Sequence, residues 1–70
     1  MIKVGTLVKW KWGSGIATGK VIEIFTKDIT KTIKGSAITR KASPGNKVFY
    51  IEQEDGAKVL KSATEIERAE

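Results

Sequence analysis

Two runs of strand-forming residues flank an Asp-Gly pair in the stretch Lys47-Val48-Phe49-Tyr50-Ile51-Glu52-Gln53-Glu54-Asp55-Gly56-Ala57-Lys58-Val59-Leu60. Asp-Gly favours the two-residue type I′ turn, in which both central residues have positive φ. The stretch therefore predicts a β-hairpin that turns at Asp55 and Gly56. Adjacent residues of a strand point to opposite faces. One of Phe49 and Tyr50 must face outward, and we expect it to be Tyr50 because its hydroxyl needs hydration.

The N-terminal part of the chain predicts two further strands. Residues 7–12, Leu-Val-Lys-Trp-Lys-Trp, alternate strictly and place Val8, Trp10 and Trp12 on one face, with lysines on the other. A Gly-Ser-Gly loop follows, and residues 16–25 then form a second run rich in β-branched residues. Gly19 within this run predicts a bulge or a sharp bend. We expect Trp10 to be buried and Trp12, next to the glycine loop, to be partly exposed.

Residues 29–33 and 37–40 predict a second hairpin. Its two-residue loop is Gly35-Ser36 or Lys34-Gly35. The second is favoured because the first would set Lys31 directly opposite Arg40. Either loop places the same five side chains on one face: Ile29, Lys31, Ile33, Ile38 and Arg40.

Two shorter patterns indicate chain reversals. Ser43-Pro44-Gly45-Asn46 has Pro and Gly at the positions that a type II turn requires. Ser62-Ala63-Thr64-Glu65 has the spacing of a capping box, which predicts a short C-terminal helical turn running through Ile66 and Arg68.

These elements predict an all-β fold, namely a small SH3-like barrel of about five short antiparallel strands with a short C-terminal helical turn. The chain has 70 residues, which is enough for one domain over residues 1–70. Cysteine and histidine are both absent from the sequence, so packing alone must hold the fold.

The same composition excludes most catalytic chemistry. Without cysteine and histidine there are no disulfides, no imidazole bases and few ways to bind zinc or iron. The glycines at 13, 15 and 19 do not match the dinucleotide fingerprint, which needs glycine at Thr18 and a following helix. No signature of an activated nucleophile surrounds the serines. We therefore expect a non-enzymatic protein without metal or cofactor. No secretory or membrane-spanning segment is evident, which favours a cytoplasmic monomer without membrane contacts.

The charge distribution suggests a polyanionic partner. Thirteen basic residues against eight acidic ones give a net charge of +5 and a pI of about 9.7. Residues 1–22 carry four lysines and no acid, and residues 26–47 carry six basic residues and one acid. The leading hypothesis is a basic face that contacts DNA or RNA, and the alternative is that these lysines only solvate edge strands. The candidate residues are Lys9, Lys11, Lys20, Lys31, Lys34, Arg40 and Lys41.

Several segments together resemble the hypervirulence-associated TUDOR-domain family. They are Val4-Gly5-Thr6-Leu7-Val8-Lys9-Trp10, Thr18-Gly19-Lys20-Val21, Thr32-Ile33-Lys34-Gly35-Ser36-Ala37-Ile38-Thr39-Arg40, and Tyr50-Ile51-Glu52-Gln53-Glu54-Asp55-Gly56 through Val59-Leu60-Lys61-Ser62. The resemblance covers nearly the whole chain and implies an SH3-like, Tudor-type barrel in a stand-alone bacterial-type protein. It implies no particular ligand or catalytic residue.

Trp12 and Tyr50 are the candidate aromatic ligand contacts. Among lysines they could stack on bases or form part of a cage for a cation, although filling the core is the alternative role. The rival function is a Tudor-like protein or peptide adaptor. In it, these aromatics with Glu52 or Glu54 receive a basic or methylated side chain, or an exposed strand edge pairs with a partner.

Overall fold

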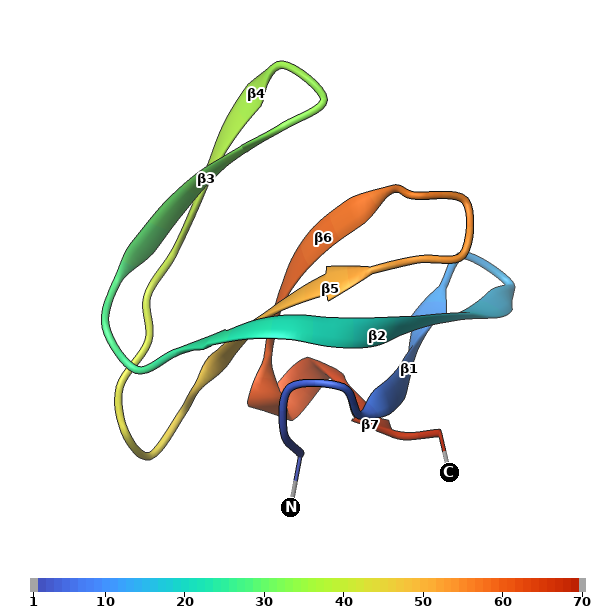
Figure 1. The fold of residues 1–70 in the computed structure, drawn as a ribbon, viewed down its shortest axis with the longest axis horizontal. Helices are drawn as coiled ribbons and strands as arrows, with labels where there is room; N and C mark the ends of the chain where they lie inside the picture. Colours follow the sequence, from blue (N-terminus) through green and yellow to red (C-terminus); the bar gives the residue numbers. More distant parts are fainter. Residues whose placement is uncertain (1, 70) are drawn as a thin grey trace.

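The computed structural model describes residues 2–69 as an all-β chain with seven strands and one 3-10 turn (Figure 1). The predicted all-β class is confirmed. The elements are β1 (Leu7–Trp12), β2 (Gly15–Phe25), β3 (Ile29–Ile33), β4 (Ser36–Arg40), β5 (Val48–Glu52), β6 (Lys58–Ser62), η1 (Ala63–Glu65) and β7 (Glu67–Arg68).

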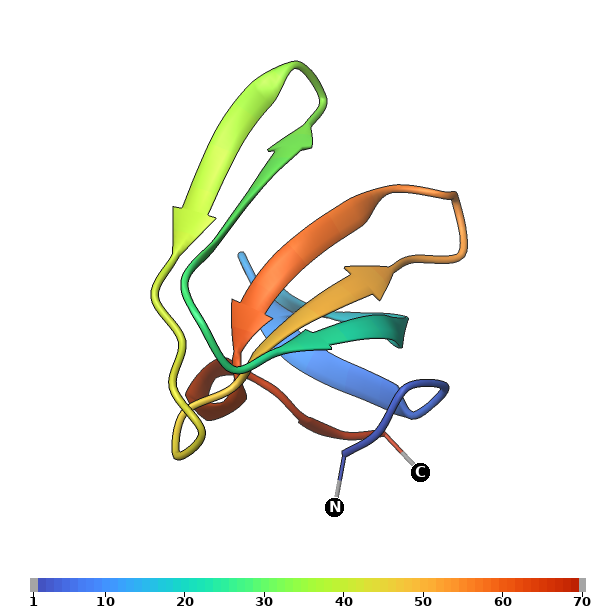
Figure 2. The same ribbon diagram turned by 60° about the vertical axis from the view of Figure 1, so that its left-hand side comes forward.

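The strands form two separate antiparallel sheets. Five strands hydrogen-bond in the order β6-β5-β2-β1-β7, and β3 pairs only with β4. The β3–β4 hairpin stands away from the curved five-stranded sheet in both views, with β4 on the side of β6 (Figure 1, Figure 2). Within residues 2–69 no ladder joins β4 to β6, so the sheets do not close into a barrel. The SH3-like barrel therefore stays a prediction.

One apolar cluster forms the core of the larger sheet. Its buried members come from β1, β2 and β5, and they are Val8, Trp10, Val21, Phe49 and Ile51. Trp10 is 4% exposed whereas Trp12, two residues further along the same face, is 72% exposed. The expected contrast between the two tryptophans is confirmed. So is the orientation of β5, because Phe49 is buried and Tyr50 only half-buried.

Gly19 has a different role from the one predicted. Of the two predicted alternatives at Gly19, the bulge is wrong, because the bulge in β2 lies between Val21 and Glu23, and the sharp bend stays a prediction. A Cβ atom at Gly19 would lie 2.5 Å from Cγ2 of Ile51 and 2.8 Å from the backbone oxygen of Glu52. Both distances are shorter than van der Waals contact allows, so glycine is required here for β2 to approach β5.

The β3–β4 turn follows the favoured alternative. Ile33 pairs with Ser36, so Lys34 and Gly35 form the two-residue loop, with φ of 51° and 79°. Two positive φ angles are characteristic of a type I′ turn. Lys31 consequently lies opposite Ile38 instead of Arg40.

The β5–β6 hairpin is present, but its predicted two-residue turn is wrong. Glu52 pairs with Lys58, and Gln53 N donates to Ala57 O at 2.8 Å, which leaves a three-residue loop. Of the Asp-Gly pair only Gly56 has positive φ, and the Asp55 carboxylate accepts a hydrogen bond from Ala57 N at 2.9 Å. This side-chain bond stabilises the longer loop, which combines a turn with a single left-handed glycine.

The C-terminal turn is shorter than predicted. The backbone N–H of Ser62 donates to Oε1 of Glu65 at 2.9 Å, as the capping-box spacing requires, and the 3-10 turn spans only Ala63–Glu65. Residues 67 and 68 then pair with β1, so the prediction of helix through Arg68 is wrong and the chain has more strands than expected. Pairing with a sheet edge satisfies more backbone groups than one isolated helical turn can. The predicted turn at Ser43 and Asn46 is confirmed by their two reciprocal backbone hydrogen bonds, but its predicted type II is wrong because Gly45 does not have the positive φ that a type II turn requires.

The two tryptophans should therefore differ in their contributions to stability. Trp10→Ala is expected to lower the free energy of unfolding by about 3 to 5 kcal/mol, because it removes a large buried ring. That is about the whole stability of a domain of this size, so this variant should be largely unfolded at room temperature. Trp12→Ala should melt within a few degrees of the parent. Circular dichroism melts compare them, and equal destabilisation would contradict the difference in burial.

Candidate functional site

Three of the predicted basic residues share the outer face of β1 and β2. The register places Lys9 opposite Thr18, Lys11 opposite Ile16, and Lys20 opposite Leu7. Strand alternation puts these lysines on the side away from Val8 and Trp10. Residues two apart on one strand are about 7 Å apart along it, and this is the spacing between Lys9 and Lys11. We call the surface formed by Lys9, Lys11 and Lys20 the lysine face.

The basic residues differ in whether an acid neutralises them. Lys31 pairs with Glu23 at 3.2 Å and Arg40 with Glu65 at 3.0 Å. Within residues 2–69, the other five candidates, which include the whole lysine face, have no ion pair. Glu52 lies opposite Lys20 in the sheet, but its carboxylate contacts Lys58 at 3.4 Å.

Lys31 is held by aromatic rings as well as by an acid. Its Nζ atom lies 5.0 Å from the centre of the Tyr50 ring and 5.5 Å from that of Phe25. The Glu23 carboxylate forms an ion pair with the same Nζ atom at 3.2 Å. Because Lys31 is on β3 and its three partners are on β2 and β5, this cluster tethers the hairpin to the larger sheet.

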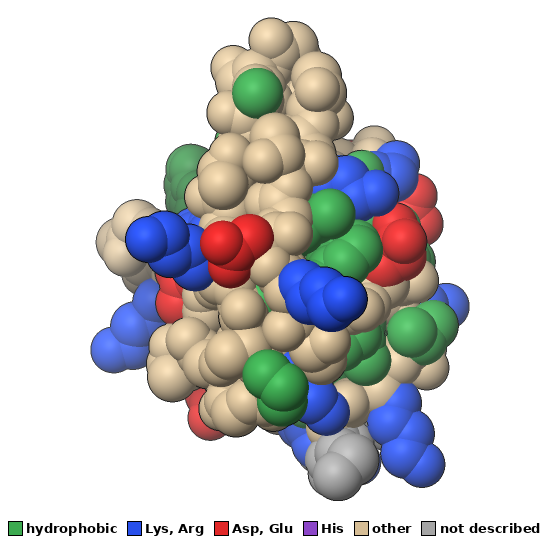
Figure 3. All heavy atoms as spheres, turned by 90° about the vertical axis from the view of Figure 1, so that its left-hand side faces the viewer, with side chains coloured by type: hydrophobic (Ala, Val, Ile, Leu, Met, Phe, Trp, Pro, Cys, Tyr) green, Lys and Arg blue, Asp and Glu red, His purple; other side chains and the backbone are tan. Residues whose placement is uncertain are grey.

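The remaining candidates do not gather into one surface. Lys34 is at the β3–β4 turn, Arg40 ends β4, and Lys41 is in the loop that follows. On the side of the molecule drawn in Figure 3, blue basic and red acidic side chains are intermixed around the base of the hairpin. Trp12 and Tyr50 are also apart, because Tyr50 contacts Lys31 while Trp12 lines a different hollow.

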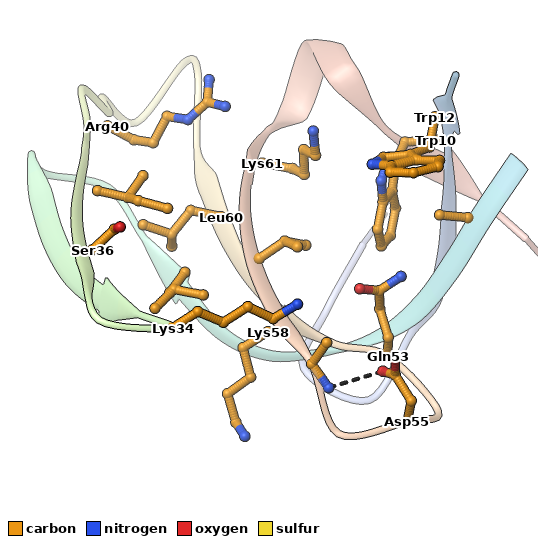
Figure 4. A pocket seen from close by; sticks show the side chains of 15 residues that line it. Trp10, Trp12, Lys34, Ser36, Arg40, Gln53, Asp55, Lys58, Leu60 and Lys61 are labelled. Carbon is orange, nitrogen blue, oxygen red and sulfur yellow. Dashed lines mark hydrogen bonds between the residues drawn. The ribbon is translucent and has the colours of Figure 1, made fainter. Parts of the chain in front are cut away.

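That hollow is a groove of about 600 Å³ between the β3–β4 hairpin and the tip of the β1–β2 hairpin, with β6 along its floor (Figure 4). We call it the β6 groove. Ser36 and Arg40 line one side of it, Trp10, Trp12 and Gln53 line the other, and Leu60 and Lys61 lie between them (Figure 4).

The residues of β6 that line this groove were not among the residues predicted from the sequence. Lys58 and Lys61 belong to the acid-rich C-terminal part of the chain, where a charge count by segment conceals them. Lys61 lies 4.0 Å from Glu65, which also binds Arg40. The available signal was that Lys58 and Lys61 flank the apolar pair Val59-Leu60 in a strand next to a turn, and this signal is weak.

Metal and membrane sites receive no support from the described residues. Among residues 2–69 no three Asp or Glu side chains come together as a metal site would require. In the same part of the chain no helix has the length and apolarity needed to span a membrane.

Comparison with known proteins adds the family. A family model described as the TUDOR domain of hypervirulence associated proteins matches residues 5–66. The chain belongs to this family. Tudor domains are generally non-catalytic binding modules, which is the general class of function that the family indicates. No curated protein and no solved structure showed significant similarity to the chain.

The tether in this Tudor domain can be tested through Lys31. Lys31→Met keeps the alkyl stem but removes the ammonium group, and should cost about 1 kcal/mol from the lost cation–π contacts and ion pair. Lys31→Arg should retain most of the stability. Urea denaturation measures both, with Lys41→Met as the control because Lys41 is exposed and has no ion pair in residues 2–69. A loss no larger than that of the control would show that the cluster does not hold the hairpin.

Proposed function

We propose that this Tudor domain is a non-enzymatic module that binds nucleic acid through the lysine face. The observation that carries the proposal is that Lys9, Lys11 and Lys20 project from one side of the β1–β2 ladder without an ion-pair partner in residues 2–69, although Glu67 of β7 lies opposite Lys9 in the sheet. An unpaired ammonium can bind a phosphate without first losing an intramolecular partner. Phosphate neutralisation with release of counterions is the main source of such affinity.

The form of nucleic acid that suits this surface best is a single strand. Trp12 ends β1, directly after Lys11, and is 72% exposed. Such a ring can stack on an unpaired base, whereas the bases of a duplex are already stacked on one another. Trp12 lies on the opposite face of β1 from Lys9 and Lys11, so a strand whose phosphates follow the lysine face would place a base on Trp12 by passing around the tip of the β1–β2 hairpin. DNA and RNA share this chemistry.

Charge removal from the lysine face should weaken binding and flatten its salt dependence. The triple variant Lys9→Gln, Lys11→Gln, Lys20→Gln is titrated with a fluorescent mixed-sequence single strand between about 50 and 200 mM salt. If all three lysines contact phosphates, the slope of log K against log salt should fall by about 2, because each contact contributes about 0.7.

A second triple variant serves as the matched control. Lys27→Gln, Lys41→Gln, Lys47→Gln removes the same charge from the loops at the opposite end of the larger sheet (Figure 1). It should keep the steep salt slope of the parent. If both triple variants lose the same affinity, binding reflects net charge alone and the lysine face is not the site. Absence of binding by the parent at low salt would end the proposal.

Trp12 should contribute to affinity without affecting the salt slope. Trp12→Ala is expected to weaken binding of the single strand by about 1 to 3 kcal/mol, the usual contribution of one stacked base. Trp12→Phe should recover part of the loss. Quenching of tryptophan fluorescence and the affinity itself are the two measurements. Unchanged affinity in Trp12→Ala would remove stacking from the proposal while leaving the phosphate contacts untouched.

A further inference from the structure

The outer edge of β6 has backbone groups that no neighbouring strand uses. Ala63 N donates to Lys47 O, and Gln53 N donates to Ala57 O, at the two ends of the β5–β6 ladder. In an antiparallel ladder, hydrogen-bonded pairs alternate with pairs whose N–H and C=O groups point away from the partner strand. Alternation between these two ends means that the backbone N–H and C=O groups that point away from β5 belong to Lys58, Leu60 and Ser62.

Only the last of these three residues has its outward N–H satisfied within residues 2–69. Ser62 N donates to Glu65 Oε1 at 2.9 Å, whereas the backbone N–H and C=O groups of Lys58 and Leu60 have no partner there. β4 runs beside this edge but belongs to the other sheet and forms no ladder with it. An unpaired strand edge of this kind is a template for an added strand.

The side chains around the edge define what such a strand would carry. On the hairpin side of the β6 groove, Ile33 and Ile38 lie near the buried side chain of Leu60. Lys34 and Lys58 are at the end of the groove near the hairpin turns, where Lys58 already pairs with Glu52 at 3.4 Å, and Asp55 is the one acidic residue among the described groove residues. At the other end a carboxylate is already in place, because Glu65 binds both Arg40 and Lys61. The lining suits apolar and acidic groups.

From these observations we propose that the β6 groove receives an extended peptide segment of a partner protein, with alternating apolar and acidic side chains, as an added strand on β6. Alternate side chains of a strand point to opposite sides, so one row would face Ile33, Ile38 and Leu60, with Lys58 on the same side of β6, while the acidic row lies on the side of Val59 and Lys61. A nucleic acid fits this edge less well, because its phosphates supply only acceptors whereas the edge presents donors and acceptors in alternation.

The groove and the lysine face are separate sites. Trp10 and Trp12 reach the groove from one face of β1, and Lys9 and Lys11 project from the other. The inference therefore does not depend on the proposed nucleic-acid binding, and either can fail while the other holds.

A capped peptide of alternating valine and glutamate is the probe, titrated into the isotope-labelled chain and followed by amide chemical shifts. The expected result is a set of saturable shifts at the amides of Lys58 and Leu60 and at facing residues of β4. The same peptide with alternate amides N-methylated should bind about tenfold more weakly or worse, since it lacks the donors for the β6 carbonyls. Equal binding of the methylated peptide would overturn strand addition.

The protein offers its own matched variants at Lys58. Lys58→Pro removes an outward N–H without removing a hydrogen bond to β5, so edge pairing should be lost while the sheet stays folded. Lys58→Gln removes the same charge and keeps the N–H, and should lose only a few-fold in affinity. If Lys58→Pro is unfolded, the methylated peptide alone decides the question.

Other occupants of the groove give distinct results. A valine–lysine peptide that binds as well as the valine–glutamate peptide would overturn the acidic preference. Shifts at Lys58 and Leu60 that appear on adding a single-stranded oligonucleotide, but not on adding the peptide, would assign the groove to nucleic acid. Concentration-dependent slowing of diffusion with the same shifts, without any peptide, would show that β6 pairs with a second copy of the chain.

Discussion

The burial of Trp10 together with Val21 and Ile51 determines most of what this small protein can present to a ligand. The chain has no cysteine and no histidine, so neither a disulfide nor a typical zinc site supplements that cluster. Close contact of β2 with β5 at Gly19 is needed to form it. Once Val8 and Trp10 face the core, strand alternation leaves Lys9 and Lys11 no direction except outward. The lysine face is thus a consequence of how the core is packed.

Placement of the β3–β4 hairpin depends on a different kind of contact. A two-stranded hairpin has little stability by itself, and this one is joined to the larger sheet by no backbone ladder within residues 2–69. Lys31 connects it to Glu23, Phe25 and Tyr50, and Arg40 connects it to Glu65. These contacts are individually weak. They nevertheless separate the basic residues into those with intramolecular partners and those available to a ligand, a distinction that net charge does not reveal.

The two faces of β1 and β2 consequently offer two kinds of surface in one family member of 70 residues. The outer face carries Lys9, Lys11 and Lys20, which have no ion pair within residues 2–69. The opposite side leads through Trp12 into the β6 groove, along a strand edge that forms no ladder with β4 within residues 2–69. Trp12 is shared between the two proposals, since it is proposed to stack on a base and also lines the groove.

Alternation and turn residues in the sequence were sufficient to predict the all-β class, the faces of β1 and β5, the burial of Trp10 and the loop at Lys34-Gly35, because each depends on neighbours within a few residues. The turn at Asp55 was predicted wrongly because its side chain bonds to Ala57 N and so stabilises a longer loop. Only the tertiary structure decided which cations are neutralised, since Lys31 and Arg40 meet acids 8 and 25 residues away. The existence of the β6 groove also depends on the tertiary structure, because the strands that line it come together only when the two sheets lie beside each other.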